Sequence, residues 1–399
     1  MKKILALILV VVVCFGLLAG CRDEEPAASE APPPSPSASA APQPTYAVNT
    51  AQFDEFPRPR IHDGEANFRI AYVHNDLSFE NQARAFNQMR LECAYRGWDL
   101  VDITASDEAS TRSAIINAIN QDVDAILFYS VDAMVAKQDL ITQARNAGIG
   151  VYNADNTMVP GIISNVTLPA GLAGMHLFYY CVGLYNSIAN FTVWTSYDFK
   201  TILERSTAFR AFLDEPTVYP EMRILEEVSV DFGNAFTSPG EQAFNTTRAW
   251  LTKFGDELDV IFCLSDNDAL PMSEAIKQEG GGSDTKIVSI DGSAAVISYL
   301  RNPDDPILCT YAQSHEAFIH NAVEIINQIQ MLGINPGDPG SLLNAAGDII
   351  FIEGGIVDRS NLPPPGSSIH SLFDYYDPNA GDDAWYNWSA GGIEPYKVD

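Results

Sequence analysis

Side chains that can bind hydroxyl groups follow several of the predicted strands. Asp155, Asp266 and Asp291 each lie just beyond a short apolar run, and Arg205 lies in a predicted helix. Gln313 adds an amide at the end of another predicted strand. Carboxylates accept hydrogen bonds from vicinal hydroxyls, and a guanidinium donates to them, often in pairs. These residue types therefore indicate a site for a small ligand that carries several hydroxyl groups.

Aromatic and further polar residues complete the candidate site. Phe79 and Phe232 offer rings on which the C–H face of such a ligand can stack. The candidate ligand-binding residues are Asp76, Phe79, Asp155, Asn156, Arg205, Phe232, Ser265, Asp266, Asp291 and Gln313.

Each of these residues also has a purely structural interpretation. Asp266 and Asp291 could each cap a helix. Arg205 could form a surface salt bridge, and Phe232 could belong to the core. The candidates occur in both halves of the chain, which favours a cleft between two domains.

The segment 258–292 shows how the fold would position these residues. Val260–Leu264 and Lys286–Ile290 are apolar runs without alternation, as expected of parallel strands buried on both faces. Between them, four polar residues, Ser265–Asp268, are followed by a predicted helix that runs to about Glu279. Three glycines end this helix. Both strands end in polar or acidic residues, at the edge where open α/β sheets bind ligands.

The same alternation of strand and helix runs through most of the chain. The first half has predicted strands at 68–73, 98–103, 125–129 and 149–153. The pattern restarts after a helix at about 169–186, with strands at 191–195, 224–230, 260–264, 286–290 and 307–311. A helix at 317–332 returns to the first domain, and a last strand is predicted at 348–353. This alternation predicts an α/β fold with two doubly wound parallel-sheet domains joined by a hinge.

The domain boundaries follow from this pattern. We expect residues 67–167 and 314–345 to form the first domain, and residues 168–313 and 346–360 to form the second. Residues 361–399 are rich in Pro, Gly, Asp and aromatic residues, and are expected to be a C-terminal extension.

The N-terminal segment resembles the export signal of a bacterial lipoprotein. Two lysines precede the apolar run Ile4–Val13, which is short for a membrane span. Leu17-Leu18-Ala19-Gly20-Cys21 resembles a lipobox, which implies removal of residues 1–20 and acylation of Cys21. Residues 21–66 then include a tether rich in Pro, Ala, Ser and Glu. The sequence therefore predicts a protein anchored by lipid to the outer face of the cytoplasmic membrane.

Composition excludes several classes of function. The net charge of −29 makes nucleic acid an improbable partner. Cys93, Cys181, Cys263 and Cys309 are far apart inside predicted elements, so we expect buried free thiols rather than disulfides. The chain has no P-loop, no GxSxG motif and no His or Cys spacing typical of a metal site. We therefore expect no cofactor, no metal and no enzymatic reaction.

Residues 68–355 resemble the type I periplasmic binding proteins, in particular their ribose/galactose-type sugar-binding branch. Several local motifs support this resemblance. Glu204–Phe209 looks like the family's ER-x-x-x-F helix, whose Arg holds sugar hydroxyls. Asp231-Phe232 is similar to an Asp-Phe pair whose ring lines the pocket. Ser265–Leu270 and Ile290–Gly292 resemble the two strand-end motifs, and Tyr311–Gln313 resembles the hinge-side Gln motif.

The chain also departs from the family pattern. Asn156 stands where the family has Arg, Ser265 stands where it has Asn, and the first loop, 74–81, lacks the Asn-Pro-Phe-type pattern. The resemblance still implies a monomeric solute-binding lipoprotein that passes a small polar ligand, expected to be a sugar, to the permease of an ABC importer. A sensor that signals to a membrane kinase, and a binder of nucleosides or furanosyl signal molecules, are the alternatives. An enzyme with Asp266 or Asp291 as an acid–base group is a third alternative, for which the sequence shows no paired-carboxylate motif.

Overall fold

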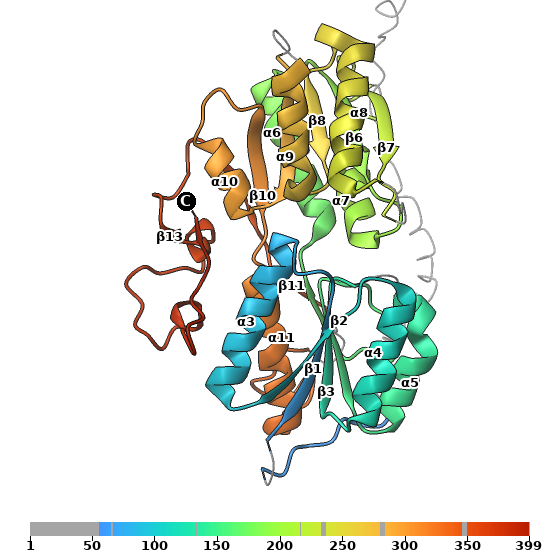
Figure 1. Ribbon diagram of the computed structural model, residues 1–399, viewed down its shortest axis with the longest axis vertical. Coiled ribbons are helices and arrows are strands. Elements are labelled where there is room, and N and C mark those ends of the chain that lie inside the picture. The colour runs from blue at the N-terminus through green and yellow to red at the C-terminus, as the bar shows by residue number, and fades with distance from the viewer. Residues whose placement is uncertain are drawn as a thin grey trace, which may run out of the picture. The chain divides into compact units, whose positions relative to one another are not determined.

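Two six-stranded sheets form the framework of the computed structural model (Figure 1). The structure describes residues 56–64, 67–131, 134–215, 217–232, 237–279, 284–344 and 349–398. The predicted export signal, Cys21 and most of the predicted tether lie outside these residues.

The first sheet is parallel throughout, with the order β11-β5-β4-β3-β1-β2. Its strands are β1 (Arg69–His74), β2 (Asp99–Thr104), β3 (Ala125–Tyr129), β4 (Gly150–Ala154), β5 (Asn165–Thr167) and β11 (Ile349–Phe351). Alternate residues of β1 face opposite sides of the sheet, because successive side chains of a strand point in opposite directions. Ile70 and Tyr72 join one apolar cluster, whereas Ala71 and Val73 join another.

The second sheet repeats this order as β12-β10-β9-β8-β6-β7, and only β12 is antiparallel to its neighbour. Its strands are β6 (Ala189–Thr195), β7 (Met222–Ser229), β8 (Val260–Cys263), β9 (Lys286–Asp291), β10 (Ile307–Ala312) and β12 (Gly355–Asp358). The predicted fold class, with two mainly parallel sheets and flanking helices, is confirmed.

Helices cover both faces of each sheet. Figure 1 shows α3 and α11 on one face of the first sheet and α4 and α5 on the other. These helices are α3 (Glu80–Arg96), α4 (Glu108–Asn120), α5 (Gln138–Asn146) and α11 (His315–Ile326), the last extended by a π-helical turn at Asn327–Met331. Helices of the second sheet are α6 (Ala170–Leu184), α7 (Lys200–Arg210), α8 (Pro239–Phe254), α9 (Asp266–Glu279) and α10 (Ala294–Leu300).

Local signals in the sequence fix several helix ends. The Asp107 side chain accepts from the amide of Ser110 and forms a capping box at the start of α4. Gly97 ends α3 with a φ of 70°, a conformation that glycine adopts without steric cost. The cap at Asp107 lies shortly after β2, so the first turn of α4 begins near the carboxyl end of that strand.

The chain crosses between the sheets three times. It passes from β5 to α6, from β10 to α11, and from β11 to β12. The prediction that residues 346–360 belong as a whole to the second domain is wrong at β11, because Ile349–Phe351 pairs in parallel with β5 of the first sheet. This short apolar strand carries no local signal for which sheet edge it joins.

The C-terminal segment, residues 361–398, packs on both halves. Ile369, Phe373 and Val398 are buried in the apolar cluster under α8, α9 and α10 of the second half. On the first half, Trp388 stacks on Tyr95 of α3, with ring centroids 3.8 Å apart. Residues 361–398 therefore contribute to the core of the second half and also contact the first.

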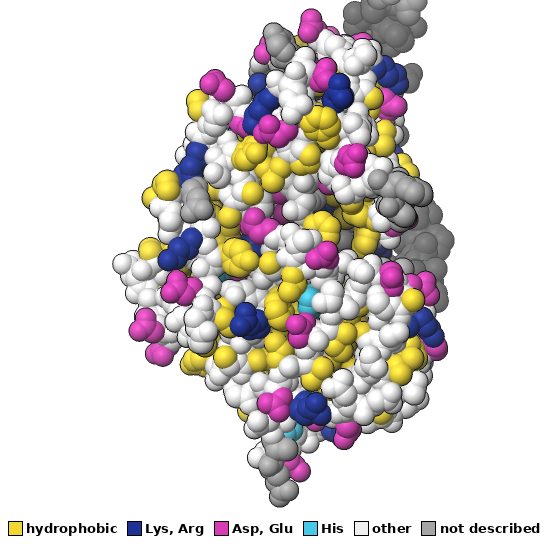
Figure 2. Space-filling model, in the orientation of Figure 1, with side chains coloured by type: hydrophobic (Ala, Val, Ile, Leu, Met, Phe, Trp, Pro, Cys, Tyr) yellow, Lys and Arg dark blue, Asp and Glu magenta, His cyan; other side chains and the backbone are white. Residues whose placement is uncertain are grey.

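Three remaining findings concern the cysteines, the helices and the surface charge. Cys93, Cys181, Cys263 and Cys309 are free and buried, as predicted. Among the described residues, no helix combines the length and apolar character needed to cross a membrane. Figure 2 shows acidic and basic side chains interspersed on one face of the molecule, with no large basic patch there.

Candidate functional site

A cavity of about 130 Å³ lies where the carboxyl ends of the strands of both sheets meet the first turns of the helices. By the criterion that one water needs roughly 10–15 Å³, it holds roughly ten water-sized spheres, about the number of heavy atoms in a monosaccharide. The first half contributes Asn75 after β1, Ser130 after β3 and Asp155 after β4. The second half contributes Arg205 from α7 and Asp291 at the end of β9.

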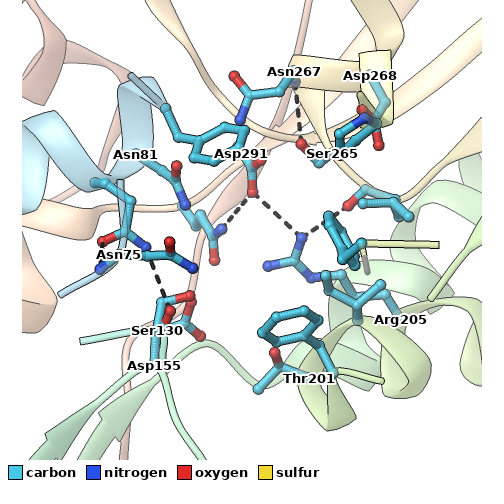
Figure 3. Close-up of a pocket in the computed structure, with 18 residues that line it drawn as sticks. Asn75, Asn81, Ser130, Asp155, Thr201, Arg205, Ser265, Asn267, Asp268 and Asp291 are labelled. Atoms are coloured by element: carbon cyan, nitrogen blue, oxygen red, sulfur yellow. Dashed lines mark hydrogen bonds and ion pairs between the residues drawn. The ribbon is translucent and has the colours of Figure 1, made fainter. Parts of the chain in front are cut away.

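Arg205, Asp291 and Gln313 form the polar centre of this cavity. The Arg205 side chain donates from Nη1 to the carbonyl oxygen of Leu264, 2.9 Å away, and to Oδ1 of Asp291, 3.3 Å away. Gln313 donates from Nε2 to the same Asp291 oxygen over 2.5 Å. Figure 3 shows the guanidinium directed toward Asp291, with Asn75 and Asp155 on the opposite side of the cavity.

Close packing of α6 against α7 positions Arg205. Gly174 of α6 lies so near the α7 backbone that a Cβ there would overlap the carbonyl oxygen of Arg205 and would lie 3.1 Å from the amide nitrogen of Phe209. The neighbouring Ser206 hydroxyl bonds to Thr195 of β6 over 2.6 Å. Both contacts hold this turn of α7 against the second sheet.

The backbone is unusual at both cavity carboxylates. Asp155 has a φ of 51° and Asp291 a φ of 133°, and few residues other than glycine adopt such values. Gly292 follows with a φ of 70°, and a Cβ there would lie 2.5 Å from Cβ of Ala312. Strained residues of this kind often occur in binding sites, where they direct side chains at a ligand.

Burial and nearby charge act in opposite directions on the two carboxylates. Burial raises the pKa of Asp155, and the positive charge of Arg205 partly offsets the rise. Burial also raises the pKa of Asp291, where Arg205 again opposes the rise and the charge of Asp155 adds to it. The charged forms of both carboxylates are therefore stabilised by the same guanidinium, that of Arg205. A ligand hydroxyl that donates a hydrogen bond to either carboxylate also favours the charged form of that carboxylate.

Several cavity atoms lack hydrogen bonds within the described part of the chain. These are Oδ1 of Asn81, Nε of Arg205 and Oε1 of Gln313, all of them buried. A buried polar atom without a partner costs about 1–3 kcal/mol. Two acceptors and one donor are thus available to a ligand.

Seven of the ten predicted site residues line the cavity, namely Phe79, Asp155, Arg205, Phe232, Ser265, Asp291 and Gln313. Phe232 is 38% exposed, so it is not a core residue, and its ring meets Phe199 edge to face with centroids 5.1 Å apart. Whether these residues bind ligand stays a prediction.

The other three lie elsewhere. The Asp76 carboxylate accepts from the amide of Ser78 over 2.8 Å, inside the turn that precedes α3. Asp266 accepts from Ser289, Ser293 and Thr310, so it ties α9 to β9, β10 and the start of α10. Asn156 lines a neighbouring cavity.

Asp268 is an acidic cavity residue that the sequence analysis missed. Its carboxylate accepts from Nε1 of Trp194 over 2.9 Å and lines the cavity, whereas Asp266 does not. Burial raises the pKa of Asp268 to about 6, and burial together with the charge of Asp291 raises the pKa of Asp266 to about 7. Other cavity residues missed are Asn75, Asn81, Gln82, Ser130, Phe199, Thr201, Ile202, Pro239, Leu264 and Asn267.

A strand-order signal could have found two of the missed residues. Asn75 and Ser130 follow β1 and β3, which are adjacent although they are not consecutive. Such a reversal of strand order is where doubly wound sheets bind ligands. Within the described residues, no group of three or more His, Cys, Asp or Glu side chains is arranged to hold a metal ion.

Comparison with known families decides the class of protein. The model of the periplasmic binding protein domain matches residues 70–330. The chain belongs to this family. The family that the motifs predicted is therefore confirmed. The prediction that the chain is not an enzyme is also confirmed, because the proteins of this family bind solutes.

Solved structures of periplasmic binding proteins share the fold. A sugar ABC transporter protein from Yersinia enterocolitica is 19% identical with a TM-score of 0.66, over 80% of this chain and 92% of that one. A solute-binding protein from Bacillus halodurans, with bound myo-inositol, is 18% identical with a TM-score of 0.62, over 75% and 97%.

A third neighbour is the 5-methylthioribose transporter solute-binding protein from Thermotoga lettingae, which is 18% identical with a TM-score of 0.64, over 77% and 88%. A search of curated proteins gave no match.

Proposed function

We propose that this periplasmic binding protein captures a sugar or a related polyol in the cavity between its two sheets and delivers it to an ABC-type importer. The observation that carries the proposal is the buried cluster of Arg205, Asp291 and Gln313, which leaves Nε of Arg205 and Oε1 of Gln313 without partners among the described residues. No bond of the ligand is broken in this function.

The cavity chemistry suits an uncharged polyol. Carboxylates at Asp155 and Asp291 accept from hydroxyls, and Arg205 donates to them. The rings of Phe79, Phe199 and Phe232 line the same cavity and offer faces for C–H groups. The structural neighbours with bound myo-inositol and 5-methylthioribose support the same class of ligand.

Contacts between the halves support a closed arrangement around the ligand. The Glu80 carboxylate at the start of α3 accepts from the amide of Ala294 over 2.7 Å. Arg84, one turn further along α3, donates to the carbonyl oxygen of Gly292 over 3.1 Å. In the proposed function these contacts form as the hinge closes and break as it opens.

Delivery to an importer requires an extracytoplasmic location. The family supports that location. We further propose that Cys21 carries lipid and holds the protein at the outer face of the cytoplasmic membrane, because residues 17–21 read as a lipobox after a charged and apolar segment.

The proposal is tested by thermal unfolding of residues 56–399 in the presence of pentoses, hexoses, inositols and other polyols. A ligand that binds only the folded state adds about 2.7 kcal/mol at a hundredfold excess over its dissociation constant. One class of polyol should raise the midpoint, and it should not do so in Arg205→Ala. A panel without any shift would contradict the proposal.

A further inference from the structure

A second cavity, of about 200 Å³, adjoins the first on the side of the first sheet. The two cavities share four lining residues, namely Ser130, Asp155, Phe199 and Thr201. A group attached to a ligand in the first cavity can therefore extend into the second without leaving the protein.

The inner wall of the second cavity is mainly apolar. Val131 and Met134 are buried there, and Phe199 lies between the two cavities. The charged residues of this cavity are the buried Asp155, which also lines the first cavity, and the exposed Asp198 and Lys200. A second sugar ring would place several hydroxyls against this apolar wall, whereas a flat apolar group would fit it.

One polar side chain of the wall is available to a ligand. Asn156 is 8% exposed, and its Nδ2 makes no hydrogen bond within the described residues. Its backbone is held from both sides by Asn165, which accepts from the Asn156 amide over 3.2 Å and donates to the Asn156 carbonyl over 2.6 Å. The backbone is thus fixed while the side-chain amide keeps a free donor at the wall of the cavity.

We propose that the natural ligand is a glycoside, in which the sugar occupies the first cavity and a flat, largely apolar substituent occupies the second and accepts a hydrogen bond from Asn156. A nucleobase or an aryl aglycone has this chemistry. A free monosaccharide would leave both the Asn156 donor and the apolar wall unused. This inference rests on the proposed function and narrows its ligand class.

The test compares each parent sugar with substituted forms by titration calorimetry. The pairs are D-ribose with uridine and adenosine, and D-galactose with the p-nitrophenyl α- and β-galactosides. At least one substituted form should bind about tenfold more tightly than its parent, which corresponds to about 1.4 kcal/mol. If every substituted form binds no more tightly than its parent, the inference is overturned.

Variants separate the two cavities. Asn156→Leu should remove most of the tenfold preference and leave the dissociation constant of the parent sugar within about twofold, which also shows that the variant is folded. Arg205→Ala should weaken parent and substituted forms alike. A preference that survives in Asn156→Leu would overturn the role of Asn156, and the absence of binding by all sugars and glycosides to the unmodified chain would overturn the proposed function itself.

Discussion

Replacing Gly174 by alanine should destabilise the protein, although alanine is the better helix former. The added Cβ would overlap the carbonyl oxygen of Arg205 in α7, which is backbone and cannot move without the helix. Overpacking of this kind costs about 1–3 kcal/mol or more, whereas the change from glycine to alanine inside a helix gains about 1 kcal/mol. Since the overlap is with backbone, we expect a net loss of about 1–2 kcal/mol.

The matched control is Gly183→Ala in the same helix. A Cβ at Gly183 would meet no atom within 4 Å, so this variant should gain up to about 1 kcal/mol. The two variants should therefore differ by about 1–3 kcal/mol in the free energy of unfolding, measured by urea denaturation. Their midpoints in a thermal scan should differ by roughly 1–4 °C, because the unfolding entropy of a chain of this length corresponds to about 1–1.5 °C per kcal/mol.

Equal stability of Gly174→Ala and Gly183→Ala would show that the α6–α7 packing leaves room for a Cβ at residue 174. Ligand affinity gives a second measurement, because α7 carries Arg205. A ligand that stabilises the unmodified protein should bind more weakly to Gly174→Ala and with unchanged affinity to Gly183→Ala.

Three further predictions concern stability. Glu316→Gln should cost about 3–5 kcal/mol, because it leaves the buried Arg84 guanidinium, now 2.7 Å from the carboxylate, without its counter-charge; urea denaturation at pH 7 measures this. Asp268→Asn should stabilise the protein at pH 8 by up to about 3 kcal/mol but not at pH 4, since burial raises the pKa of Asp268 from 3.8 to about 6 while Trp194 can still donate to the new amide oxygen. Ending the chain after residue 360 should lower the thermal midpoint by more than about 10 °C or prevent folding. This truncation removes Ile369, Phe373 and Val398 from the apolar cluster of the second half.

The pH dependences of the two acidic groups have opposite signs. Burial alone would raise the pKa of Glu316, but the charge of Arg84 outweighs it and holds that pKa at about 2. The contribution of Glu316 is therefore complete above about pH 4.5 and is lost as the pH falls toward 2. The raised pKa of Asp268 means that stability falls as the pH rises from about 4 to about 6.

Each stability prediction has a result that contradicts it. An acid limb of the same steepness in Glu316→Gln and the unmodified protein would contradict the ion-pair account. Equal stabilisation of Asp268→Asn at pH 4 and pH 8 would show that charge is not the cause. A truncated chain with an unchanged midpoint would show that residues 361–399 are not part of the core.

Much of the fold and of the cavity follows from sequence because strand ends carry many of the residues that line the cavity. The apolar runs at 68–73 and 260–264 mark buried strands, and the order of strands and helices fixes which edge of each sheet faces the cavity. Asp291 and Gln313 could be predicted for this reason, since each lies where a strand ends. The edge strand β11 could not be placed, because three apolar residues pair equally well with either sheet.

Side-chain direction within the site could not be predicted. Asp266 and Asp268 lie two residues apart at the start of α9, yet only Asp268 lines the cavity. The difference depends on Ser289 and Thr310, which bind Asp266 from neighbouring strands far along the chain. Contacts between residues this far apart in the chain leave no pattern in the local sequence from which the direction of a side chain could be predicted.

We infer that Arg205 and its neighbours bind a polyol ligand in the first cavity. The most direct measurement is titration calorimetry of the polyol that most raises the thermal midpoint, with Arg205→Ala and Arg210→Ala compared. Arg210 lies on the same helix but pairs with Glu227, 2.9 Å away, and does not line the cavity. We predict that Arg205→Ala weakens binding at least a hundredfold, or about 2.7 kcal/mol, and that Arg210→Ala changes it less than threefold. Equal affinities for the two variants would contradict the account.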